Sequence, residues 1–153
     1  MARALLGCGT PAFMDFDKMM AELFADEDRA RGMAKHLMDL AQRDVHAAAR
    51  EKESVLAFLR GPMERHMAYE ETTMFPKLAE HGLEPEVDVA KKHHEQIRAE
   101  ARNLEKATAP EDVARTIFMA ARLMLHHTNF EGDFIYPELS REQWRALMTA
   151  TSK

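Results

Sequence analysis

Two stretches of the chain carry the same arrangement of side chains that can bind a metal ion. Residues 66–78 read HMAYEETTMFPKL and residues 127–139 read HTNFEGDFIYPEL. In both copies a His is followed by an aromatic residue three positions later, Glu four later, Pro ten later and Leu twelve later. Residues i and i+4 lie on one face of an α-helix, about one turn apart. Each stretch therefore presents an imidazole beside a carboxylate, which is typical of metal binding rather than of packing.

A further His precedes each copy, on the helix expected before it. His36 lies upstream of His66, and His94 lies upstream of His127. The chain thus reads as two halves, each a helix with one His followed by a helix with His-x-x-x-Glu. The predicted metal ligands are His36, His66, Glu70, His94, His127 and Glu131.

Four imidazoles and two carboxylates without a thiolate suit iron, manganese or zinc. Two carboxylates that bridge two ions leave open positions for a small ligand, which favours redox-active iron over a closed structural zinc site. Apolar residues lie around the His of each copy, such as Met63 and Met74 around His66. A His and a Glu within an apolar stripe are expected to face the core and to be satisfied there by metal.

Four other polar residues near these positions leave their roles open. His93 and His126 each stand one residue before a predicted ligand, so they point about 100° away from it on a helix. Both are expected beside the site or at the surface, with ligation as the alternative. Glu71 is expected to be solvated or to support a ligand. Tyr69 is expected to pack near the site, with a hydrogen bond to a bound ligand as the alternative. None of the eight histidines follows a Glu by three residues, which argues against a ferritin-like site.

The composition is that of one ordinary globular domain of 153 residues. Asp and Glu outnumber Lys and Arg by 26 to 21, and the net charge of −5 argues against a nucleic-acid partner. Cys8 is the only cysteine, which excludes an internal disulfide and a multi-thiolate metal site. The longest uncharged run, residues 4–14, is too short to span a bilayer, so a cytoplasmic location without a membrane partner is expected.

The elements that must position these residues are predicted to be helices throughout. The fold class expected is all-α, an antiparallel up-down four-helix bundle with short flanking N- and C-terminal helices. Gly61 and Pro62 are expected to kink the second long helix rather than to start it. A capping box at Ser140–Gln143 predicts a last short helix. The expected organisation is residues 1–26 as an extension with a short helix over 13–25, residues 27–139 as the bundle, and residues 140–153 as the C-terminal helix and tail.

The pattern H…HxxxE…H…HxxxE, closed in both copies by an aromatic residue and Pro, resembles the hemerythrin-like (HHE cation-binding) family over residues 29–139. The resemblance implies a four-helix bundle around a non-haem centre of two iron ions. It implies that His36 and His66 hold one iron and that His94 and His127 hold the other. Glu70 and Glu131 would bridge the irons together with an oxo or hydroxo group.

The chain departs from the pattern of the oxygen-carrying members of that family. Those members have a further His four residues along the third helix, where this chain has Arg98. They also have an Asp five residues after the last His, where this chain has Gly132. The departures favour reaction with a small oxidant over reversible oxygen storage.

The expected function is therefore binding of, and reaction with, O2, H2O2 or NO in defence against oxidative or nitrosative stress. The resemblance leaves two alternatives: an oxygen, NO or redox sensor or iron-binding module that acts through a protein partner, and an iron donor for damaged iron–sulfur centres. Whether the protein is an enzyme stays open; an enzyme would be peroxide-decomposing or an NO- or O2-reactive oxidoreductase. The protein is expected to be a monomer or a homodimer.

Overall fold

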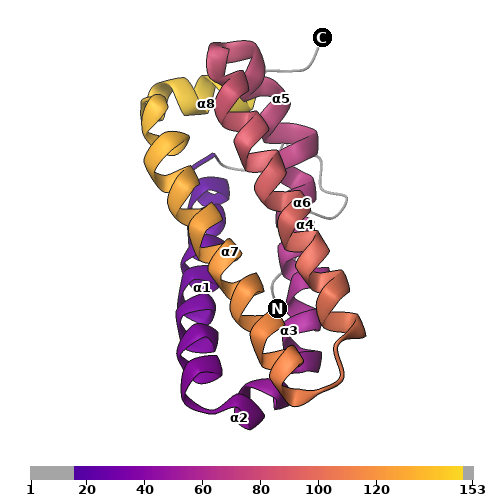
Figure 1. The fold of residues 1–153 in the computed structure, drawn as a ribbon. Helices are drawn as coiled ribbons and strands as arrows, with labels where there is room; N and C mark the ends of the chain where they lie inside the picture. The colour runs from indigo at the N-terminus through magenta and orange to yellow at the C-terminus, as the bar shows by residue number, and fades with distance from the viewer. Residues whose placement is uncertain (1–15, 150–153) are drawn as a thin grey trace.

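The computed structural model describes residues 16–149, which form an all-helical bundle (Figure 1). Four long segments make the bundle: α1 (Phe16–Arg43), a second segment over residues 52–78, α6 (Glu84–Lys106) and α7 (Pro110–Phe134). α7 packs along both α1 and α6, and α3 (Lys52–Phe58) of the second segment packs against α6 and α7. The predicted all-α four-helix bundle is confirmed. Cys8 and the expected helix start at Phe13 lie outside the described residues.

The first long helix differs from the prediction. α1 is one unbroken helix, so the short helix expected over 13–25 and the long helix expected from 27 are a single element. The expected boundary between residues 26 and 27 therefore falls inside α1. The reason is a continuous buried stripe, whose members recur every three or four residues as the helical period requires. The stripe consists of Phe16, Met19, Met20, Leu23, Glu27, Ala30, Ala34 and Leu37.

The second segment continues through its prolines by means of π turns. After α3 come the π turn η2 (Leu59–Met63), α4 (Glu64–Tyr69), the π turn η3 (Glu70–Met74) and α5 (Phe75–Leu78). Pro62 lies inside η2, and at the end of η3 the N–H of Phe75 donates to the carbonyl of Glu70. Proline has no N–H to donate, and a π turn admits an extra residue where the regular ladder is interrupted. Gly61 and Pro62 therefore lie within a longer helix rather than at its start.

Short elements close the two ends of the bundle. At one end α2 (Val45–Arg50) begins at Asp44, whose carboxylate accepts a hydrogen bond from the N–H of Ala47. At the other end α8 (Arg141–Thr149) packs against α1 and α5. The capping box before α8 is confirmed, because the Ser140 N–H donates to Gln143 Oε1 at 2.8 Å and the Gln143 N–H donates to Ser140 Oγ at 3.1 Å. No helix within residues 16–149 is long and apolar enough to cross a membrane.

Two apolar clusters fill the bundle, one on each side of its middle. The cluster toward α2 includes Leu37, Val55 and Ile117, and the cluster toward α8 includes Leu23 and Phe75. Between them, each long segment contributes buried polar side chains at the same level. These residues are Glu27, His66, Glu70, His93, His94, His127, Thr128 and Glu131. The two apolar clusters thus enclose a layer of buried polar side chains in the middle of the bundle.

Candidate metal centre

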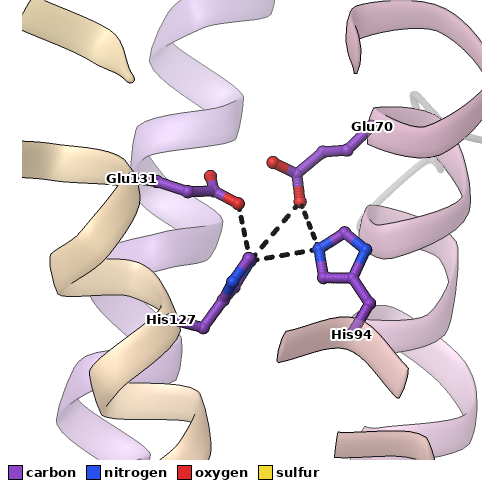
Figure 2. Close-up of side chains that lie close together, drawn as sticks. All are labelled: Glu70, His94, His127 and Glu131. Atoms are coloured by element: carbon purple, nitrogen blue, oxygen red, sulfur yellow. Dashed lines mark hydrogen bonds and ion pairs between the residues drawn. The ribbon is translucent and has the colours of Figure 1, made fainter. Parts of the chain in front are cut away.

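One group of possible metal ligands lies between the second segment, α6 and α7 (Figure 2). It consists of Glu70, His94, His127 and Glu131, whose ligand atoms all lie within 4.8 Å of one another. His127 Nε2 is 2.5 Å from Glu131 Oε1 and 3.1 Å from His94 Nε2. Glu70 Oε1 is 3.3 Å from His94 Nε2 and 3.8 Å from His127 Nε2. Two imidazoles and two carboxylates therefore converge on one point.

A second group lies beside the first and includes a residue from α1. Its members are Glu27, His66, Glu70 and Glu131, again within 4.8 Å of one another. His66 Nε2 is 3.4 Å from Glu70 Oε1 and 3.8 Å from Glu27 Oε1. Glu70 and Glu131 belong to both groups, which is the arrangement that two bridging carboxylates require. Five of the six predicted ligands thus lie together in the polar layer.

His36 does not join them, so the prediction for α1 is corrected. Its side chain is exposed, and neither ligand group within residues 16–149 contains it. Glu27 occupies the expected place on α1 instead. The two residues are nine positions apart, and at about 100° per residue they point to opposite sides of the helix. The signal that could have found Glu27 is a carboxylate within the apolar stripe between Leu23 and Ala30.

The buried polar atoms of these residues fit metal ions. Both carboxylate oxygens of Glu70 and Oε1 of Glu131 are buried, and beyond the imidazole contacts given above they have no hydrogen-bond partner among residues 16–149. An unsatisfied buried polar group costs about 1–3 kcal/mol, and more when the group is charged. Carboxylate and imidazole are ligands that iron, manganese and zinc accept. Cations between the two groups would satisfy the oxygens and offset their charge.

The electrostatics of the centre's own residues follow from three buried carboxylates that lie close together. Burial and the neighbouring Glu131 raise the pKa of Glu27 to about 10. Burial alone would lower the pKa of His127, but Glu131 and Glu70 outweigh it and raise that pKa to about 10. Burial would raise the pKa of Glu70, yet His66 and the other imidazoles hold it well below its usual value. Without metal, protons on Glu27 and His127 therefore balance part of the negative charge.

Glu71 and Arg98 support His94 from the outer side. His94 Nδ1 lies 3.1 Å from Glu71 Oε2, and Arg98 donates to that oxygen at 2.7 Å. Arg98 also donates to Glu64 at 2.9 Å. These donors outweigh the effect of burial and lower the pKa of Glu71. A carboxylate on the outer nitrogen of a ligating His fixes the orientation and the tautomer of the ring. Glu71 would act in this way on His94, which is one of the two roles expected for it.

His93 and His126 lie beside the centre rather than in it. His93 is buried, and its Nδ1 lies 3.3 Å from His127 Nδ1. Its ring also contacts the rings of His126 and Phe130. Burial, followed by the charges of the neighbouring imidazoles, lowers the pKa of His93 to about 4, so this ring is neutral and can accept a hydrogen bond from His127. His126 is exposed.

Tyr69 packs beside the centre, as expected from the sequence, whereas Tyr136 makes a polar contact with it. The hydroxyl of Tyr69 contacts Met19 Sδ at 3.2 Å, in the apolar cluster toward α8. Tyr136, which was not predicted, donates to Glu27 Oε1 at 2.6 Å, and its oxygen is 3.3 Å from Glu131 Oε2. The indole N–H of Trp144 donates to the backbone carbonyl of Tyr136 and fixes this segment. The available signal was the place of Tyr136 in the second repeated stretch, five residues after Glu131.

A partly open pocket of about 40 Å³ connects the surface with the second ligand group. Its inner wall contains Glu27, His66 and His127, and its rim contains Arg29 and Pro62, which are exposed. The remaining lining residues are Asp26, Ala30, Phe58, Met63 and Thr128. Arg29 forms an ion pair with Asp26 at the rim. The space suits one or two water-sized molecules, which includes a diatomic gas or a peroxide.

Comparison with known proteins identifies the family of the chain. The model of the hemerythrin HHE cation binding domain matches residues 18–139, which include every ligand described above. No curated protein and no solved structure gave a match. The family model covers most of the chain, and the bundle and its buried His and Glu groups are those that a cation-binding domain of this kind requires. The chain therefore belongs to the hemerythrin family, as a hemerythrin HHE cation binding domain.

Proposed function

We propose that the protein holds two iron ions and that this centre binds and reacts with a small oxidant, O2, H2O2 or NO, in defence against oxidative or nitrosative stress. The observation that carries the proposal is the pair of buried ligand groups that share Glu70 and Glu131. Four ligand residues per group leave positions for an external ligand on an ion that takes six. Iron bound there would supply electrons and a Lewis acid for the small molecule.

The surrounding residues support reaction rather than a closed structural site. The pocket admits a molecule of the right size to Glu27, His66 and His127. The apolar clusters on both sides keep bulk water away, which strengthens charge interactions inside. Glu71 holds His94 and His93 holds His127, so both rings would keep one orientation while ligands enter and leave.

Arg98 supports the same conclusion from the outer side. Oxygen-carrying relatives are expected to have a fifth His at this place, and here the guanidinium donates to Glu64 and Glu71. The group on α6 that would complete an oxygen carrier is therefore absent, because Arg98 is committed to holding the carboxylate behind His94. This arrangement favours turnover over storage.

The test loads the metal-free chain with Fe²⁺ without oxygen and then adds H2O2. We expect about two irons per chain, a near-ultraviolet charge-transfer band after oxidation, and sustained oxygen evolution. His66→Ala should lose iron and evolution, whereas His36→Ala, a change at an exposed position of α1, should keep both. Fewer than about one iron per chain with no such band would overturn the proposal. A stable adduct without turnover would point to a sensor instead.

A further inference from the structure

We infer that the two halves of the centre are chemically unequal, and that the Glu27–His66 half accepts manganese in place of iron far more readily than the His94–His127 half. The inference rests on the proposed two-metal site. Glu70 and Glu131 belong to both halves, so they do not distinguish them. The difference reduces to one carboxylate and one imidazole in the first half against two imidazoles in the second.

This difference acts on metal preference through ligand type. Imidazole suits iron, zinc and copper, whereas carboxylate oxygen suits manganese, magnesium and calcium. Any such site binds Fe²⁺ more tightly than Mn²⁺, because affinities follow the order of the first-row series. Replacing an imidazole by a carboxylate reduces the ratio of Fe²⁺ affinity to Mn²⁺ affinity. This ratio should therefore be lowest in the half that contains Glu27, which offers three carboxylates and one imidazole.

Glu27 is held where it can act as a ligand. The hydroxyl of Tyr136 donates to Oε1 at 2.6 Å, and the side chain lies within the buried stripe of α1 with only 3% of its surface exposed. The carboxylate therefore cannot turn out to solvent without breaking this hydrogen bond and the packing of the stripe. The same oxygen lies 3.8 Å from His66 Nε2, and because a carboxylate oxygen has two lone pairs, it can accept from Tyr136 and still bind an ion beside His66.

The two halves also differ in access. The pocket is lined by Glu27 and His66 from one half and by His127 from the other, whereas His94 is absent from its lining and fully buried. His94 is tied in addition to Glu71, which Arg98 holds. Both residues that distinguish the Glu27–His66 half therefore line the pocket, so an ion there can exchange through it, while the other half reaches the pocket through His127 alone. Ligand type therefore favours manganese in the Glu27–His66 half, and the pocket favours exchange of the ion held there.

The experiment incubates the full metal-free chain with one equivalent of Fe²⁺ and one equivalent of Mn²⁺ per chain without oxygen, so that iron cannot fill both halves of every chain. Crystals are then measured on both sides of the manganese and iron absorption edges. We expect manganese in the Glu27–His66 half and iron in the His94–His127 half. Manganese spread evenly over both halves, manganese confined to the His94–His127 half, or iron in both would overturn the inference.

Two variants test the cause. Glu27→His gives both halves two imidazoles, and the bound manganese should fall several-fold relative to iron, as measured by elemental analysis. His36→Ala, on the exposed side of the same helix, should leave the ratio unchanged. An unchanged ratio in a folded Glu27→His protein would overturn the inference, and the maps of the unmodified chain decide the matter if the variant fails to fold. Fewer than about one bound ion per chain would overturn the proposed function as well, whereas two ions without site preference would overturn this inference alone.

Discussion

At the scale of single residues, Glu27 adds to the buried charge of the candidate centre. It brings a third carboxylate into contact with Glu131 and close to Glu70, in a layer from which water is largely excluded. Such a cluster is unfavourable without a cation, because burial and repulsion act in the same direction. The same charge becomes favourable once metal is bound. Substitutions in this cluster should therefore have opposite effects on the metal-free and metal-loaded protein.

Glu27→Gln is the direct test of this reversal. We expect the metal-free variant to gain about 1–3 kcal/mol in free energy of unfolding, since one buried acidic group is removed. The metal-loaded variant should lose stability and one ion, because an amide is a weaker ligand than a carboxylate. Urea denaturation with and without metal measures both effects. A loss of stability in both states would show that Glu27 is structural.

Tyr136→Phe tests the hydrogen bond that holds Glu27. Loss of the hydroxyl should weaken metal affinity in the Glu27–His66 half by about tenfold, the effect of removing a group that orients a ligand. Stability of the metal-free protein should change by only about 1 kcal/mol. Tyr69→Phe is the matched control, because the hydrogen bond of its hydroxyl within residues 16–149 is to the sulfur of Met19. Metal titration of both variants makes the comparison, and equal affinities would contradict the role of Tyr136.

At the scale of elements, two π turns, one at Glu70 and one before α6, determine the course of the chain around the candidate ligands. η3 begins at Glu70 itself, so the irregular turn lies at the ligand that both groups share. The second segment is followed by the π turn η4 (Ala79–Leu83), where Gly82 has φ of 95°. A residue with a side chain is disfavoured in this left-handed region. The turn to α6 therefore depends on Gly82.

Two glycines make a matched pair for this conclusion. Gly82→Ala should lower the free energy of unfolding by about 1–2 kcal/mol, because Ala is strained at positive φ. Gly32→Ala should raise it by about 0.5–1 kcal/mol, since Gly32 lies within α1 and an added Cβ meets no atom within 4 Å. Chemical denaturation of both variants provides the measurement. Equal effects of the same sign would contradict the argument from backbone conformation.

At the scale of the whole molecule, we expect metal binding and folding to be coupled. All four long segments contribute to the polar layer, so an ion bound there links segments that are distant in the sequence. The unfolded chain cannot offer the same ligands together. Metal should therefore stabilise the native bundle as a unit.

Removal of metal should accordingly lower the melting temperature. Free metal at about 1,000 times its Kd contributes about 4 kcal/mol, which corresponds to a shift on the order of 10 °C for a chain of this size. Calorimetry before and after treatment with a chelator measures the shift. His36→Ala should show the full shift, and a Glu70→Ala variant, which loses a residue of both ligand groups, should show little. An unchanged melting temperature in the unmodified protein would contradict the coupling.

Metal uptake should also depend on pH. The raised pKa of His127, about 10, means that both nitrogens of its ring carry a proton at neutral pH when no metal is present. Metal must displace that proton, so binding releases protons and the affinity falls as pH falls. Calorimetric titrations in buffers of different ionisation enthalpy measure the number of protons released. Zero release at pH 7 would contradict the prediction.

Much of the fold and of the centre could be predicted because it depends on short-range periodicity. His66 and Glu70 share a helix face, as do His127 and Glu131, since four residues make about one turn. The capping box before α8 is equally local. These features hold in any structure in which the stretches are helical.

The α1 ligand and the surroundings of the centre were decided by tertiary packing. Both Glu27 and His36 lie on α1, and only the buried stripe from Phe16 to Leu37 determines which of them faces inward. Likewise, Tyr136 reaches Glu27 across 109 positions of the sequence. The amino-acid sequence by itself determined which side chains share a helix face, because that depends on bonds within one turn. Only the tertiary structure decided which faces meet, because the phase of each helix depends on the area that all four segments bury together.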